Sequence, residues 1–152
     1  MDLVARLEQF RAEERKLAWQ GTFKDYFDIV ISRPDVSQLA HERIFNMIMA
    51  VGTEDAGGGL KSYKFFNEEL YGLDRTLQQI VDYFNSAGKR LEVRKRILLL
   101  MGPVGGGKST IVSMLKRGLD MYTRSDGGAV YAIKSCPMHE EPLHLLPDTV
   151  RP

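Results

Sequence analysis

The segment 102–109 constrains the fold of this chain more than any other part of its sequence. It matches the pattern G-x-x-x-x-G-K-[ST] in full. An apolar run at 96–101 precedes it, and the segment 110–119, whose apolar positions gather on one side of a helix, follows it. The apolar run is typical of a buried strand. A strand, a glycine loop and a helix in this order predict a phosphate-binding loop.

Each residue type in this loop has a mechanical role. Glycine permits positive φ, so that successive N–H groups can converge on an anion at the positive end of a helix. Lys108 is expected to place its ammonium on the β- and γ-phosphates, and the Ser109 hydroxyl is the expected Mg²⁺ ligand. The candidate residues for binding a nucleoside triphosphate are Gly102, Pro103, Val104, Gly105, Gly106, Gly107, Lys108 and Ser109.

Charge and composition exclude several other classes of protein. The 21 Lys and Arg nearly balance the 20 Asp and Glu, so we expect no polyanion-binding surface and do not favour nucleic acid as a partner. The lone Cys136 excludes an internal disulfide and fits a reducing cytosol. Neither a signal peptide nor an apolar run of about 18 residues is present in the sequence. We therefore expect a cytoplasmic protein without membrane contact.

The pattern along the chain predicts two domains. Residues 1–51 carry helical periodicity, including a helix opened by a capping box of Thr22 and Asp25 and a third helix that starts at Asp35. Residues 52–61, with three successive glycines, are typical of a flexible linker. We expect an N-terminal helical module at 1–51 and an α/β domain at 62–152.

Within the second domain, the positions 73, 77, 80, 81 and 84 form the cleanest amphipathic helix, and residues 129–133 predict a second buried strand. Two strands cannot complete a parallel sheet, which needs neighbouring strands and helices on both faces. A triphosphatase also needs an acidic residue at the end of a second buried strand, and none follows Ser109 in such a context. We therefore expect the first part of a longer protein, truncated after its second sheet strand.

Four stretches of the chain resemble the N-terminal ATPase region of the PrkA family, bacterial proteins known as serine protein kinases. These stretches are residues 13–48, 63–84, 89–119 and 128–147. The resemblance implies a P-loop NTPase fold of the AAA+ type and an ATP-dependent enzyme that phosphorylates serine in a protein substrate. It also implies that the Walker B acids and sensor residues lie outside this chain, so the catalytic residues stay unknown and the chain alone is expected to be inactive. A homo-oligomer of the full-length protein is a further implication.

The resemblance assigns more residues to the nucleotide. In AAA+ proteins a short apolar element with a glycine covers the adenine, and Leu70-Tyr71-Gly72-Leu73 matches this element, with Tyr71 and Gly72 as the expected nucleotide contacts. An aromatic ring over a purine gains contact area, whereas the alternative is that Tyr71 only caps a core helix. Thr110 and Ile111 are the expected contacts to the α-phosphate and the base side. ATP and Mg²⁺ are the implied cofactors.

Two alternatives are left open. The chain contains no H-R-D or D-F-G motif, so an AAA+ machine that remodels or degrades protein clients is the second interpretation. The loop with Cys136, His139 and His144 has three donors for metal, but their spacing fits none of the common zinc patterns. Because ligands meet the loops at the carboxyl ends of strands, we expect residues 135–147 to face a substrate or a subunit instead.

Overall fold

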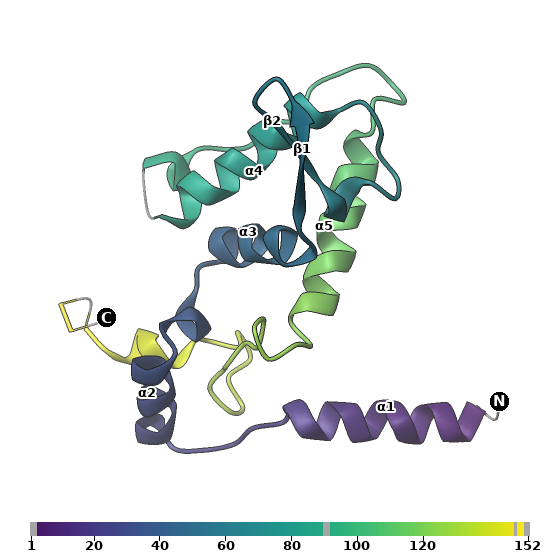
Figure 1. Ribbon diagram of the computed structural model, residues 1–152. Helices are drawn as coiled ribbons and strands as arrows, with labels where there is room; N and C mark the ends of the chain where they lie inside the picture. Colours follow the sequence, from purple (N-terminus) through teal and green to yellow (C-terminus); the bar gives the residue numbers. More distant parts are fainter. Residues whose placement is uncertain (1–2, 90–91, 148, 151–152) are drawn as a thin grey trace. The chain divides into compact units, whose positions relative to one another are not determined.

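The computed structural model describes residues 3–89, 92–147 and 149–150, and the chain divides into two compact units (Figure 1). The first unit combines the N-terminal segment up to Ser37 with the segment from Thr123 onward, and the second runs from Gln38 to Tyr122. The expected boundary at 52–61 therefore differs from the observed division, because the third helix packs with the segments that follow it in the sequence. None of the described helices is long and apolar enough to cross a membrane.

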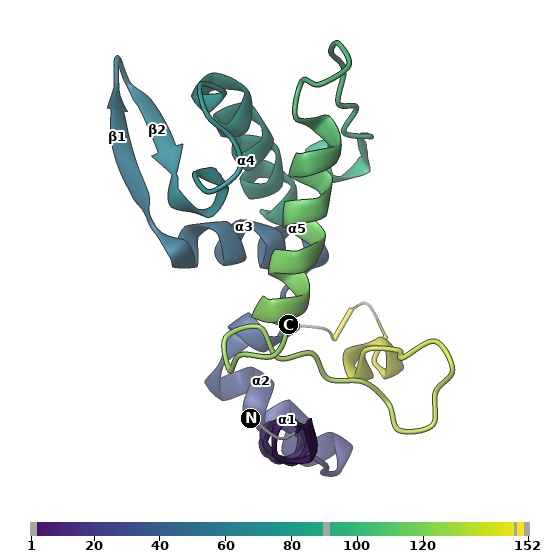
Figure 2. The ribbon, with the colours of Figure 1, turned by 90° about the vertical axis from the view of Figure 1, so that its right-hand side faces the viewer.

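Over its described residues, 38–89 and 92–122, the second unit contains three α-helices, a β-hairpin and two short 3-10 helices. In chain order they are α3 (Ala40–Val51), β1 (Thr53–Gly57), β2 (Leu60–Tyr63), η2 (Lys64–Phe66), α4 (Asp74–Gly88), η3 (Glu92–Lys95) and α5 (Lys108–Tyr122). The hairpin, α4 and α5 stand side by side over α3 (Figure 2). Their shared core includes Met47, Ile48, Phe66, Leu77 and Ile111.

Helix α4 confirms the expected amphipathic helix, which the structure extends to Gly88. Four of the apolar positions in the pattern, Leu77, Ile80, Val81 and Phe84, are buried in the core. Their three- and four-residue spacing places them on one face, so burial of that face stabilises the helix more than intrinsic propensity does. At its end, Gly88 lies so close to α3 that a Cβ there would be 2.9 Å from the Cα of Glu42.

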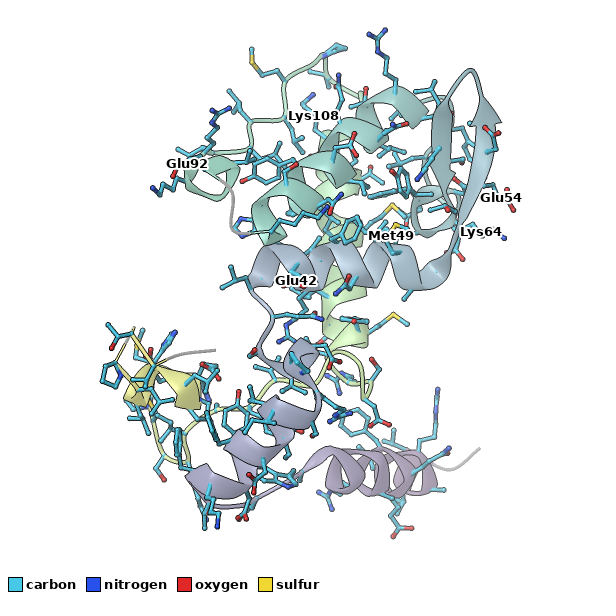
Figure 3. The ribbon with its side chains drawn as sticks, turned by 60° about the vertical axis from the view of Figure 1, so that its left-hand side comes forward. Glu42, Met49, Glu54, Lys64, Glu92 and Lys108 are labelled. Atoms are coloured by element: carbon cyan, nitrogen blue, oxygen red, sulfur yellow. The ribbon has the colours of Figure 1, made fainter. Side chains whose placement is uncertain are left out.

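The segment 52–61, expected to be a flexible linker, forms most of an antiparallel hairpin. Gly57 pairs with Leu60, and the two residues between them, Gly58 and Gly59, have φ of +62° and +79°. Two successive positive φ values give the tight turn whose twist matches the flanking strands, so glycines that suggest flexibility here specify a turn. Across the ladder Lys64 pairs with Glu54 at 3.0 Å (Figure 3). A further hydrogen bond joins the hairpin to α4, because the Lys61 amide of β2 donates to the Gln78 side chain of α4 at 3.1 Å.

The two expected strands at 96–101 and 129–133 are absent, and β1 with β2 forms the one sheet among the described residues. In the first segment Ile97 is 93% exposed and Met101 83% exposed. A strand is stabilised by hydrogen bonds to a neighbouring strand, and no partner strand lies beside either segment within the described residues. An apolar sequence alone therefore did not produce a strand at either place. The structure shows a mixed helix–strand chain with a small two-stranded sheet.

The first unit contains α1 (Leu3–Leu17), α2 (Phe23–Ser32) and the short helices η1 (Pro34–Ser37) and η4 (Pro142–Leu145). The predicted capping box is confirmed, because the Thr22 amide donates to the Asp25 carboxylate at 2.8 Å and the Asp25 amide donates to the Thr22 hydroxyl at 3.3 Å. The start of the third helix at Asp35 was wrong. That residue belongs to η1, and α3 begins at Ala40 because Leu39 is extended.

The core of the first unit joins both of its chain segments. Tyr26, Val30 and Val36 come from the N-terminal segment and pack with Leu143 of η4. The hydroxyl of Tyr26 donates to the Glu141 carboxylate, which also accepts from the amide of Leu143 at the start of η4. The segment 129–133, expected to be a strand, instead lines a groove of 620 Å³. Aromatic residues of α2 and of the segment just before α2 line the same groove.

Tyr63 at the end of β2 gives a prediction for alkaline pH. Burial raises the pKa of its hydroxyl above the ordinary value, and the nearby charge of Asp82 raises this pKa further. The folded state therefore holds the phenolic proton more tightly than the unfolded chain does. The stabilisation is fully present below about pH 10 and is lost as pH rises through the folded pKa.

The unfolding free energy of the unmodified protein falls as pH rises from about 10 through the folded pKa of Tyr63, and we expect this fall to be smaller in Tyr63→Phe, because the titrating hydroxyl is gone. The measurement is urea denaturation across this pH range, with Tyr71→Phe as a control at an exposed tyrosine. Identical pH profiles for Tyr63→Phe and the unmodified protein would contradict the prediction.

Candidate functional site

The glycine loop lies at the N-terminal end of α5, as the sequence predicted. Lys108 is the first residue of the helix, and the Ile111 amide donates to the Gly107 carbonyl at 2.9 Å to begin the helical hydrogen bonding. Ile111 and Met114 are buried in the core of the second unit and hold this end of the helix in place. The loop therefore stands on a rigid element whose N-terminus carries partial positive charge.

The chain enters the loop from a second fixed point. The hydroxyl of Tyr83 on α4 donates to the Arg96 carbonyl at 2.8 Å, just before the exposed apolar segment. This hydrogen bond attaches the segment 96–101 at its start, and α5 holds the chain at the other end of the loop. The glycine loop thus spans two anchored elements of the same unit.

The ammonium of Lys108 is folded back over its own loop (Figure 3). Its Nζ donates to the carbonyl of Gly102 at 2.8 Å and to the carbonyl of Pro103. The amide of Gly106 donates to the same Pro103 carbonyl at 3.2 Å. These carbonyl partners are neutral, so an anion that reaches the loop offers the ammonium a stronger, charge-assisted partner.

Gly107 is required at its position for two separate reasons. Its φ of +74° lies in the left-handed region, which strains any residue with a Cβ. A Cβ there would also lie 3.0 Å from Cδ2 of Leu70 and 3.4 Å from Cδ1 of Leu73. The close approach shows that the residues just before α4 pack directly against the glycine loop.

This packing brings the expected base-side element, Tyr71 and Gly72, next to the loop. Leu70 is buried and Leu73 is half-buried, whereas Tyr71 between them is 80% exposed. The two leucines anchor the turn, and the Tyr71 ring projects into solvent. An exposed aromatic ring at this place can pack its face on a planar group of a ligand.

The remaining predicted residues divide by exposure. Pro103, Val104, Gly105 and Ser109 are exposed, so their backbone and hydroxyl groups are open to a ligand. Ile111 points into the core, where it anchors α5. Sequence reasoning missed both the packing of Leu70 on Gly107 and the carbonyl partners of Lys108, since both depend on contacts that no motif encodes.

The loop with Cys136, His139 and His144 belongs to the first unit. A hydrogen bond from the Ile133 amide to the Glu140 carbonyl at 2.9 Å closes the part that holds Cys136 and His139, and His144 of η4 pairs with the Glu140 carboxylate. No group of three metal-type ligands occurs among the residues that the structure describes. The pairing of His144 with Glu140 gives this histidine a structural partner within the loop.

Comparison with known proteins gives the family to which this chain belongs. The family described as the PrkA AAA domain matches residues 21–152. The chain therefore belongs to the PrkA AAA domain family. No solved structure matches the chain.

Several curated relatives are similar to parts or all of the chain. "ATP-dependent protease PrkA" of Bacillus subtilis is 57% identical over 152 residues, which is 99% of this chain and 24% of the relative. "Serine/threonine kinase YeaG" of Escherichia coli is 51% identical over 49 residues, covering 32% of this chain and 8% of that protein. "Lon protease" of Clostridioides difficile is 25% identical over 129 residues, or 78% of this chain and 16% of the relative. The chain thus spans about a quarter of the length of its Bacillus relative.

Proposed function

We propose that this chain binds Mg²⁺–ATP through residues 102–109 and is the nucleotide-binding part of an ATP-dependent enzyme. The observation that carries the proposal is the position of Lys108, at the first residue of α5 with its ammonium over the carbonyls of Gly102 and Pro103. Phosphate oxygens that enter the loop can replace these carbonyls as partners of the ammonium. Helix N-termini of this kind favour anions through free N–H groups and the helix dipole.

The proposal extends to the other candidate residues. Ser109 is exposed in the first turn of α5 and offers its hydroxyl to Mg²⁺. Tyr71 and Gly72 are proposed to cover the base, with support from the packing of Leu70 on Gly107. A P-loop NTPase domain of the AAA+ type is the fold in which we place these residues, in line with the family match.

A calorimetric titration of the full-length protein with ATP tests the binding proposal. We expect one saturable site per chain, with weaker binding when EDTA removes Mg²⁺, because the metal neutralises phosphate charge and bridges to Ser109. Absence of binding at millimolar ATP would contradict the proposed function.

For the whole protein we propose that ATP hydrolysis drives work on a protein client. The Bacillus relative that matches 99% of this chain is named an ATP-dependent protease, and the Lon protease of Clostridioides difficile is similar over 78% of the chain. Serine phosphorylation is the second candidate, supported by the kinase name of the Escherichia coli relative over 49 residues. The two activities differ in where the γ-phosphoryl group goes.

Incubation of full-length protein with γ-labelled ATP and casein separates these two activities. We expect label in free phosphate, together with loss of the client protein. Label on serine residues of casein, without its degradation, would contradict the protease proposal and support the kinase. A Lys108→Ala variant in parallel shows whether either activity depends on this loop.

A further inference from the structure

The segment from Phe65 to Leu73 contacts α5 at two places, and it contacts Gly107, the residue just before α5, at a third. We call this segment the strap. Its first contact is at Gly118, where a Cβ would lie 2.5 Å from Cε2 of Phe65. The second is an ion pair between Glu69 and Arg117, and the third is the packing of Leu70 and Leu73 on Gly107. The contacts run in opposite order along the two segments, so the strap leads from the body of α5 towards its N-terminal end.

Glu69 of the strap forms the ion pair with Arg117 of α5, two positions before the exposed Tyr71. A turn fixes its backbone, since the amides of Glu69 and Leu70 both donate to the Phe66 carbonyl, at 3.2 and 3.0 Å. Phe66 itself is fully buried. The carboxylate of Glu69 therefore extends from a rigid turn, and Tyr71 follows only two residues later.

Helix α5 carries Lys108 at one end and Arg117 further along. The Glu69–Arg117 pair is a second attachment of the strap to this helix, in addition to the packing of Leu70 and Leu73 on Gly107. We propose that the Glu69–Arg117 pair is a positioning pair, which holds Tyr71 beside the loop and so sets the affinity for the base side of the nucleotide. This inference rests on the proposed binding of ATP, and the pair acts through Tyr71 rather than by touching the ligand.

The ordinary alternative is a surface ion pair without a role in binding. The Arg117 and Glu69 side chains are 63% and 40% exposed, and exposed pairs contribute little to global stability. A purely structural pair would leave ligand affinity unchanged, or would alter affinity for every ligand of the loop alike. The positioning role predicts instead a change that depends on whether the ligand has a base.

The test compares ATP with inorganic tripolyphosphate, both with Mg²⁺, on Glu69→Gln and Arg117→Gln variants of the full-length protein. We expect each variant to bind ATP about threefold more weakly, in the range that exposed ion pairs supply, and to bind tripolyphosphate as the unmodified protein does. The double variant should lose no more than either single one, because the pair is already broken. Glu54→Gln is the matched control, since it breaks the similarly exposed Lys64–Glu54 pair of the hairpin.

Charge reversal adds a rescue. Glu69→Arg combined with Arg117→Glu should regain ATP affinity relative to either reversal alone. Unchanged ATP affinity in the neutral variants, or equal losses for ATP and tripolyphosphate, would overturn the positioning role while leaving the proposed binding intact. If the unmodified protein binds neither ligand, both the proposed function and this inference fall together.

Discussion

Lys108→Ala is expected to weaken ATP binding by about 100-fold. The substitution removes a charged hydrogen-bond donor of a kind that contributes about 1.5–3 kcal/mol, or about 10- to 150-fold in affinity. The measurement is the Kd for ATP in the presence of Mg²⁺, by calorimetry or by competition with a fluorescent analogue.

Lys116→Ala is the matched control for this experiment. Lys116 is an exposed lysine about two turns further along the same helix, so its removal changes net charge equally without touching the loop. We expect the control to keep its ATP affinity and both variants to keep their melting temperature. A Lys108→Ala protein that binds ATP as tightly as the control would refute the nucleotide site.

Gly88→Ala is expected to destabilise the second unit by about 2 kcal/mol, which is typical of overpacking against a position that cannot yield. The added Cβ would lie 2.9 Å from both the Cα and the Cβ of Glu42, and a helix backbone cannot move aside as a flexible side chain does. The sign of the effect is diagnostic, because replacing glycine by alanine inside a helix normally stabilises by up to about 1 kcal/mol.

Gln79→Ala on the exposed face of α4 controls for the general effect of alanine, and we expect a change within about 0.5 kcal/mol. The free energy of unfolding is measured by urea denaturation, with equal m-values required for the comparison. A higher midpoint for Gly88→Ala than for the unmodified protein would show that α3 and α4 are not in close contact at this crossing.

Features with a local physical cause were predicted well from the sequence. The amphipathic spacing of α4 identified its buried face, and the capping box of Thr22 and Asp25 formed as expected. The glycine loop does end at a helix, although that helix starts at Lys108 and continues to Tyr122, beyond the expected 110–119. In each case the cause lies within a few residues of the chain.

Features that depend on a distant partner were predicted poorly. The apolar segments 96–101 and 129–133 have the composition of strands, yet neither has a neighbouring strand in the described residues. The glycines of 57–59 were interpreted as a linker, but the turn they form closes a hairpin packed on α4. The composition of a segment limits the secondary structures that it can form, and the segments that pack against it determine which of them it forms.

The sequence by itself determined the candidate nucleotide site, because the chemistry of residues 102–109 is contained in eight consecutive residues at a helix start. Only the tertiary structure decided what stands beside that loop. Leu70 reaches Gly107, and Glu69 pairs with Arg117, which lies 48 residues further along the chain. Such contacts follow from the packing of α4 and α5 on a shared core, and packing of this kind depends on the whole unit rather than on any one segment.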